Sequence, residues 1–193
     1  DFAKAVETFD EALKLDPDNS EIKEEREAAD RKAKALALKA QGEKEMADGD
    51  YAKAVDTLLS ALKLDPDNKE VADEEAAAEK LLRAQELKKE GDTAMEGCQY
   101  ADAARLYDMA SKLAPDDGSL PKLKKLANRK ADAQRLRQQA QAEAAAGEFA
   151  KAVETFDKAL KLDKHNPDIQ AERDAAARKA QALVLKRQGE KQM

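Results

Sequence analysis

The sequence has few of the residues on which enzymes and disulfide-stabilised proteins usually depend. It contains one histidine, one cysteine and no tryptophan in 193 residues, and aromatic residues make up only 4% of the chain. A lone cysteine excludes an internal disulfide framework and fits a reducing compartment, so we expect an intracellular, cytoplasmic protein. No apolar run approaches the ~18 residues that span a bilayer, so we expect no membrane insertion.

Glycine and proline are also scarce, with 7 and 5 residues respectively, which leaves little room for long loops or sheet turns. Charged residues make up 39% of the chain and strong helix formers dominate, so the composition predicts an all-α fold. The net charge of −6 argues against a nucleic-acid groove. This charge is unevenly distributed, because residues 1–98 carry −11 and residues 99–193 carry +5.

An internal period of 49 residues organises the chain. An aromatic residue followed by alanine recurs at this spacing, at Phe2, Tyr51, Tyr100 and Phe149. The period predicts one repeat array made of residues 1–49, 50–98, 99–147 and 148–193. Because the chain starts at one turn and ends just before the equivalent turn, we expect an excerpt of a longer array.

Each repeat contains the pattern of a short helix followed by a long one. Apolar residues at helical spacing predict a short helix from Tyr51 to Leu64, and Asp65-Pro66 ends it. An unbroken pattern predicts a long helix from Ser20 to Ala47, which Gly49 ends. The expected N-caps of the long helices are Asn19, Asn68, Asp117 and Asn166.

The unequal helix lengths have a geometric consequence. A helix of about 28 residues rises ~42 Å and one of about 14 residues descends ~21 Å, so each repeat should advance ~20 Å. We therefore expect a staggered, elongated rod or superhelix in which any cross-section holds about three helices.

The run GDYAKAVDTLLSALKLDPDN, from Gly49 to Asn68, resembles the second helix and exit turn of a tetratricopeptide repeat (TPR). Tyr51, Ala54, Ala61 and Pro66 occupy the signature positions of that family. The resemblance implies a TPR-like solenoid of helical hairpins that binds proteins or peptides. The family's repeat has about 34 residues, so roughly 15 extra residues lie in the first helix of each hairpin here.

The chemically reactive residues give no catalytic pattern. His165 lies in an interhelical turn, and Cys98 replaces a turn glycine with no histidine nearby in the sequence. The acidic turn at residues 16–19 lacks the central glycine and terminal glutamate of a calcium loop. We therefore expect no enzyme activity, no cofactor and no metal.

Two positions of the repeat are aromatic or leucine and are expected to form the core. Their members are Phe2, Phe9, Tyr51, Leu58, Tyr100, Tyr107, Phe149 and Phe156. All seven aromatic residues are used at these positions, so none remains as an anchor for a tight interface.

A basic residue also recurs, always three residues before a small glycine or alanine. This candidate peptide-binding position consists of Lys39, Lys88, Arg137 and Lys186. In co-chaperone members of the family, a similar Leu-Lys-x-x-Gly-Asn stretch holds a peptide's terminal carboxylate. The asparagine is missing here, because its place is taken by Glu43, Asp92, Gln141 and Glu190.

The sequence therefore favours a non-enzymatic scaffold that serves as a spacer or a protein-interaction platform. The alternative is a co-chaperone-like adaptor that binds acidic C-terminal peptides. The acidic first half and basic second half also suggest head-to-tail self-association. An engineered consensus repeat is disfavoured, because Cys98, Pro121 and Ala140 depart from the pattern.

Overall fold

The computed structural model describes all residues from 1 to 193 and contains eight helices and no strands. The helices are α1 (Phe2–Leu15), α2 (Ser20–Ala47), α3 (Tyr51–Leu64), α4 (Lys69–Glu96), α5 (Tyr100–Leu113), α6 (Leu120–Ala145), α7 (Phe149–Leu162) and α8 (Pro167–Gln192). The chain forms two compact units, Asp1–Glu86 and Leu87–Met193. Helix α4 contributes its first part to one unit and its last part to the other. The predicted alternation of short and long helices is confirmed.

Side-chain caps explain where most long helices begin. Asn19 accepts a hydrogen bond from the Ile22 N–H at 3.1 Å, and Asn68 and Asn166 cap α4 and α8 in the same way. Helix α6 differs, because it begins at Leu120 instead of directly after Asp117. There the Asp117 carboxylate accepts from the Ser119 N–H at 2.8 Å, which extends the turn by two residues. The prediction that Asp117 is the N-cap was therefore wrong.

The tight turns after the long helices require a left-handed backbone. Gly49 and Gly147 have φ of 80° and 83°, a conformation that glycine adopts without steric cost. Cys98 occupies the same turn with φ of 57° and is the one non-glycine residue of positive φ in the chain. The turn geometry is thus retained even where the glycine is lost.

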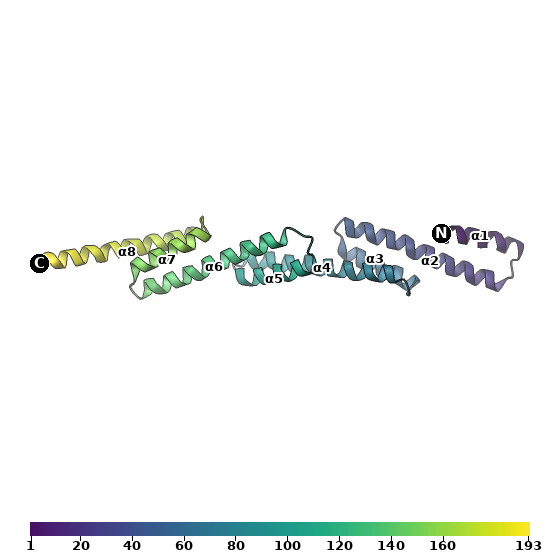
Figure 1. Cartoon of the computed structure of the whole chain (residues 1–193), viewed down its shortest axis with the longest axis horizontal. Coiled ribbons are helices and arrows are strands. Elements are labelled where there is room, and N and C mark those ends of the chain that lie inside the picture. Colours follow the sequence, from purple (N-terminus) through teal and green to yellow (C-terminus); the bar gives the residue numbers. More distant parts are fainter. The chain divides into compact units, whose positions relative to one another are not determined.

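Each unit contains a core cluster that three helices share. In Leu87–Met193, the end of α6, the whole of α7 and the start of α8 enclose Ala140, Phe156 and Ile169. Figure 1 shows α7 lying against both neighbours in that unit. In Asp1–Glu86, the end of α2, the helix α3 and the start of α4 enclose Ala35 and Leu58 in the same arrangement. Helices α2 and α6 therefore each pack against two short helices, one along each half.

The two aromatic positions of the repeat have different environments. At the second position Leu58, Tyr107 and Phe156 are buried, whereas their equivalent Phe9 is half-buried. The first position is not core, because Phe2 is 39% exposed and its equivalents Tyr51, Tyr100 and Phe149 are half-buried. A lysine from the adjacent long helix lies over three of these rings, 5.4–5.5 Å from the centroid, at Lys32, Lys130 and Lys179. The first aromatic position of the repeat therefore lies at the edge of the core, between the buried residues and solvent.

A small residue in each long helix makes room for the buried side chain of the following short helix. A Cβ atom added to Gly42 would lie 2.7 Å from the Leu58 side chain, and one added to Gly91 would lie 2.7 Å from the Tyr107 ring. The long helix and the following short helix therefore cross closely at these two glycines. Gly189 has no such neighbour within 4 Å.

We predict that Gly91→Ala destabilises the protein whereas Gly189→Ala stabilises it. The Tyr107 ring is buried and its hydroxyl donates to Asp92 at 2.7 Å, so it cannot move away from a new methyl group. Overpacking costs about 1–3 kcal/mol, which exceeds the helix-propensity gain of about 1 kcal/mol from replacing glycine. Gly189 lies at an open helix surface, so Gly189→Ala gains helix propensity without a cost of overpacking.

Thermal unfolding of both variants in dilute solution measures this difference. An equal rise in melting temperature for Gly91→Ala and Gly189→Ala would show that the close contact at Tyr107 has no energetic consequence.

Candidate functional site

The recurring basic position lies between one long helix and the next. Lys39, in the second half of α2, extends to the first turns of α4, where its ammonium lies 3.2 Å from Glu70 and 2.9 Å from Glu74. It also contacts Glu43, one turn along its own helix, at 2.5 Å. The Lys39 side chain is only 13% exposed. Its charge is therefore surrounded by carboxylates of the same chain.

Arg137 repeats this arrangement 98 residues later. Its guanidinium binds both oxygens of Glu172 at 2.5 and 3.0 Å, and it lies 3.5 Å from Asp168. Both acids lie in the first turns of α8. Arginine matches a carboxylate with two parallel hydrogen bonds, which makes this contact more directional than that of a lysine.

Lys88 occupies the same position of its repeat, but its partners bind it more weakly. Its ammonium lies 3.2 Å from the Ser119 hydroxyl and 3.8 Å from Asp117, at the start of α6. Lys186, the fourth member, contacts no second long helix in the structure. It is 72% exposed and its one carboxylate partner is Glu190 of the same helix, at 3.7 Å.

These contacts shift the acid–base properties of the groups involved. The hydrogen bond from Lys39 holds the pKa of Glu43 below its usual range, and Glu43 with Glu74 raises the pKa of Lys39. The hydrogen bonds of Arg137 likewise lower the pKa of Glu172, against the opposing effect of burial. Each group is therefore held in its charged form at neutral pH.

Two of the residues that replace the family's asparagine, Gln141 and Asp92, form hydrogen bonds with a following helix. Gln141 donates its amide to both oxygens of Glu172 at 3.0 Å. Asp92 instead accepts from the Tyr107 hydroxyl. In the Lys39 site, Glu43 stands where the Arg137 site has Gln141, so no side-chain amide is present at that position. One buried carboxylate oxygen of Glu74 has no hydrogen-bond partner there.

A second set of ion pairs joins each short helix to its own long helix. Asp10 pairs with Arg26 at 2.9 Å, Asp108 with Lys124 at 2.5 Å and Asp157 with Arg173 at 3.0 Å. In the second repeat both partners have changed, to Leu59 and Glu75. Burial and the neighbouring Glu79 raise the pKa of Glu75, as expected for a carboxylate without a cation.

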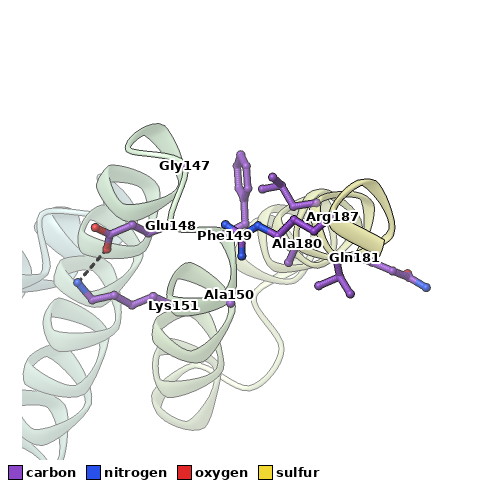
Figure 2. Close-up of a pocket in the computed structure, with 10 residues that line it drawn as sticks. Gly147, Glu148, Phe149, Ala150, Lys151, Ala180, Gln181 and Arg187 are labelled. Atoms are coloured by element: carbon purple, nitrogen blue, oxygen red, sulfur yellow. Dashed lines mark hydrogen bonds and ion pairs between the residues drawn. The ribbon is translucent and has the colours of Figure 1, made fainter. Parts of the chain in front are cut away.

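The structure has several surface hollows. One lies between the start of α7 and the middle of α8, lined by Phe149, Leu183, Val184 and Arg187 among others. Figure 2 shows Phe149 and Arg187 beside this hollow, with the Glu148–Lys151 ion pair at its rim. Its lining contains no histidine, cysteine or serine that could act as a nucleophile or a general base.

The remaining candidates of the sequence lie apart from each other. His165 is in the turn before α8, and Cys98 is exposed in the turn before α5. No three histidine, cysteine, aspartate or glutamate side chains are grouped in a way that could hold a metal ion. No helix combines the length and apolar character needed to cross a membrane.

The fold and the inter-helix contacts define an all-α protein built from tandem helical hairpins. The tetratricopeptide repeat family matches residues 1–19 and residues 138–166. These segments contain α1 with its exit turn, and the end of α6 with α7 and its exit turn. These matches support a TPR-like repeat protein, and such repeats generally serve as scaffolds that bind proteins or peptides. A comparison with curated proteins gave no match.

The sequence identified the basic position but not its partners. The signal was present, because an acidic residue follows Lys39 and Arg137 by 31 and 35 positions in both cases. Acids at the start of a helix are favoured by the helix dipole, so their presence alone does not indicate a partner. Their second role depends on how consecutive long helices overlap, which the sequence of a single repeat does not reveal.

We predict that Lys39→Met lowers the melting temperature at pH 7 by more than Lys186→Met does. Loss of the Lys39 charge leaves Glu43, Glu70 and Glu74 close together without a cation, whereas Lys186 is exposed and has one distant partner. The lowered pKa of Glu43 stabilises the fold only where the unfolded carboxylate is also ionised. The difference between wild type and Lys39→Met should therefore shrink as the pH falls below about 4.

Thermal unfolding of wild type and both variants between pH 3 and pH 8 tests this pattern. Equal losses for the two substitutions at pH 7, or a loss at Lys39 that does not depend on pH, would contradict it.

Proposed function

We propose that this chain is a non-catalytic scaffold whose repeats act as an elongated spacer and as a platform for protein–protein interaction. The observation that most supports this function is the use of the recurring basic side chain. At Lys39 and Arg137 it contacts the first turns of the next long helix, and at Lys88 it contacts Ser119 and Asp117 in the turn just before the next long helix. The most regular charged feature of the surface thus holds repeats together and leaves no repeated cationic site for a ligand.

The helix lengths support the spacer role. Helix α2 has 28 residues and α3 has 14, so the chain travels about twice as far in one direction as it returns. Each repeat should then advance ~20 Å along the helix direction. A staggered rod or superhelix built in this way would separate proteins bound at distant repeats.

The alternative is an adaptor that binds acidic C-terminal peptides through Lys39, Lys88, Arg137 and Lys186. One observation favours it, because Lys186 is 72% exposed and has no partner on another helix. At Lys39 and Arg137 a peptide carboxylate would have to displace intrachain carboxylates at 2.5–3.2 Å. We therefore favour the spacer.

We predict that small-angle X-ray scattering of the monomeric chain gives a radius of gyration well above that of a globular protein of this length. A compact chain of 193 residues would have a radius of gyration of ~16 Å. Dilution series at high salt provide the monomer needed for the measurement. A value near the compact figure would contradict the spacer proposal.

A further inference from the structure

The junction between α4 and α6 lacks an acidic residue that its two counterparts contain. At one counterpart Lys39 lies 3.2 Å from Glu70, and at the other Arg137 lies 3.5 Å from Asp168. The residue at the same position of the third repeat is Ser119, 49 residues after Glu70. A hydroxyl group therefore occupies a position at which two other repeats place a carboxylate beside a cation.

The second acidic position of this junction is also lost. Glu74 lies 2.9 Å from Lys39 and Glu172 lies 2.5 Å from Arg137, but the equivalent residue of the third repeat is Leu123. The first turn of α6 contains no acidic residue, unlike those of α2, α4 and α8. This turn therefore lacks the negative charge that favours the start of a helix.

The basic side chain of the junction is retained and contacts the serine directly. The Lys88 ammonium donates a hydrogen bond to the Ser119 hydroxyl at 3.2 Å, and it lies 3.8 Å from the carboxylate of Asp117. The Lys88 side chain is 37% exposed, whereas that of Lys39 is 13% exposed. A cation is thus held against a neutral hydroxyl and is not enclosed by anions.

Ser119 lies in an open turn between α5 and α6. The turn covers residues 114–119, of which Pro115, Asp116 and Gly118 are exposed. A Cβ atom added to Gly118 would have no atom beyond its chain neighbours within 4 Å, and the Ser119 side chain caps no helix N–H group. An enzyme that binds an extended segment can reach this turn, because a helix end opens locally at low free-energy cost.

We propose that Ser119 is a phosphorylation site whose phosphate supplies the anion that Lys88 lacks at the junction of α4 and α6. A protein serine kinase would transfer the γ-phosphoryl group of ATP to this residue. A bond forms between the Ser119 Oγ and the γ-phosphorus, the bond from that phosphorus to the β–γ bridging oxygen breaks, and ADP and the hydroxyl proton leave. The proposal goes beyond the scaffold function and does not depend on the spacer role.

A phosphate at this position carries more charge than the carboxylates at the equivalent positions. Phosphoserine has a charge of about −1.5 to −2 at neutral pH and three acceptor oxygens. It can therefore bind Lys88 and also Lys122, which is exposed and lies three residues further along the chain in the first turn of α6. Both contacts would hold the start of α6 more firmly.

One neighbouring charge opposes the phosphate. Asp117 accepts a hydrogen bond from the Ser119 N–H at 2.8 Å, and hydrogen bonds from Ser119 together with the charge of Lys88 lower the pKa of Asp117, which keeps it ionised. The Lys39 site shows that one ammonium can hold several anions, because three carboxylates lie within 3.2 Å of it. We therefore expect the attraction to Lys88 and Lys122 to exceed the repulsion from Asp117.

Genetically encoded phosphoserine at position 119 of the full chain tests the effect of the phosphate. The comparison uses the wild type, the phosphorylated chain, Lys88→Met and the phosphorylated Lys88→Met chain, with circular dichroism to confirm that each retains its helices. The phosphate should slow amide hydrogen exchange of residues 120–127 on the order of fivefold, because the new contacts hold the start of α6. In Lys88→Met the same phosphate should slow exchange by about twofold or less.

Phosphorus NMR reports the contact itself. An ammonium beside the phosphate favours its dianion, so the second pKa of phosphoserine at position 119 should be higher in Lys88→Met than in the chain that retains Lys88. A general effect of Lys88→Met on the stability of α4 would leave this pKa unchanged.

Ser20 is the matched control position. It is exposed, begins α2 and, like Ser119, is followed by a lysine three residues later, at Lys23. None of the recurring basic residues contacts it. Phosphoserine at position 20 should therefore leave hydrogen exchange of residues 120–127 unchanged, and its pKa should not respond to Lys88→Met.

Incubation of the full chain with ATP and a panel of protein serine kinases, followed by mass spectrometry, tests whether the site is modified. We expect phosphate at Ser119 in preference to Ser60 and Ser111, because these two lie within α3 and α5 and not in a turn. Ser119→Ala should remove that phosphate. Ser119→Glu, which introduces the residue type of Glu70, should slow hydrogen exchange at the start of α6 in the same direction as the phosphate.

A phosphate at position 119 that leaves exchange at the start of α6 unchanged or speeds it would overturn the proposal. So would an equal effect of the phosphate with and without Lys88, or an absence of phosphate on Ser119 with every kinase of the panel. Small-angle scattering of the unphosphorylated chain does not depend on these results, so the spacer proposal and this one fail separately.

Discussion

The rest of this structure depends on one constraint, the twofold difference in length between long and short helices. Helices α2 and α4 have 28 residues, and each short helix has 14. A short helix can cover only half of its long neighbour, so the other half must be covered by the next short helix. Consecutive long helices therefore meet where one ends and the next begins. The ion pairs of Lys39 and Arg137 lie at these meeting points.

The core that results is built mainly from small side chains. Most buried apolar residues are alanines, and the largest fully buried side chains are Tyr107, Phe156 and Leu58. Alanine lets helices pack closely, but its small side chain does little to fix the register of one helix against another. The register is instead fixed where a large side chain meets a small one, as Tyr107 meets Gly91, and by charge pairs at defined positions. This division explains why a chain with 39% charged residues can still form an ordered core.

Local signals predicted the helices well, because caps and turn residues act over a few positions. The bounds Tyr51–Leu64 and Ser20–Ala47 follow from Asn19, Gly49 and Asp65-Pro66. The start of α6 did not follow, because Asp117 binds the Ser119 N–H in an extended turn. The roles of Phe2 and Lys39 also could not be read from one repeat. The exposure of Phe2 depends on its place at the core edge, and the partners of Lys39 lie 31 and 35 residues further along the chain.

The central claim is that the recurring basic side chain fastens one long helix to the next. A double-mutant cycle between Arg137 and Glu172 tests it most directly, with Arg137→Met, Glu172→Gln and the double variant compared by chemical unfolding. The two side chains are 28% and 30% exposed and form two hydrogen bonds, so we expect a coupling free energy of about 1 kcal/mol or more. A coupling within about 0.3 kcal/mol of zero would be additive behaviour and would contradict the account.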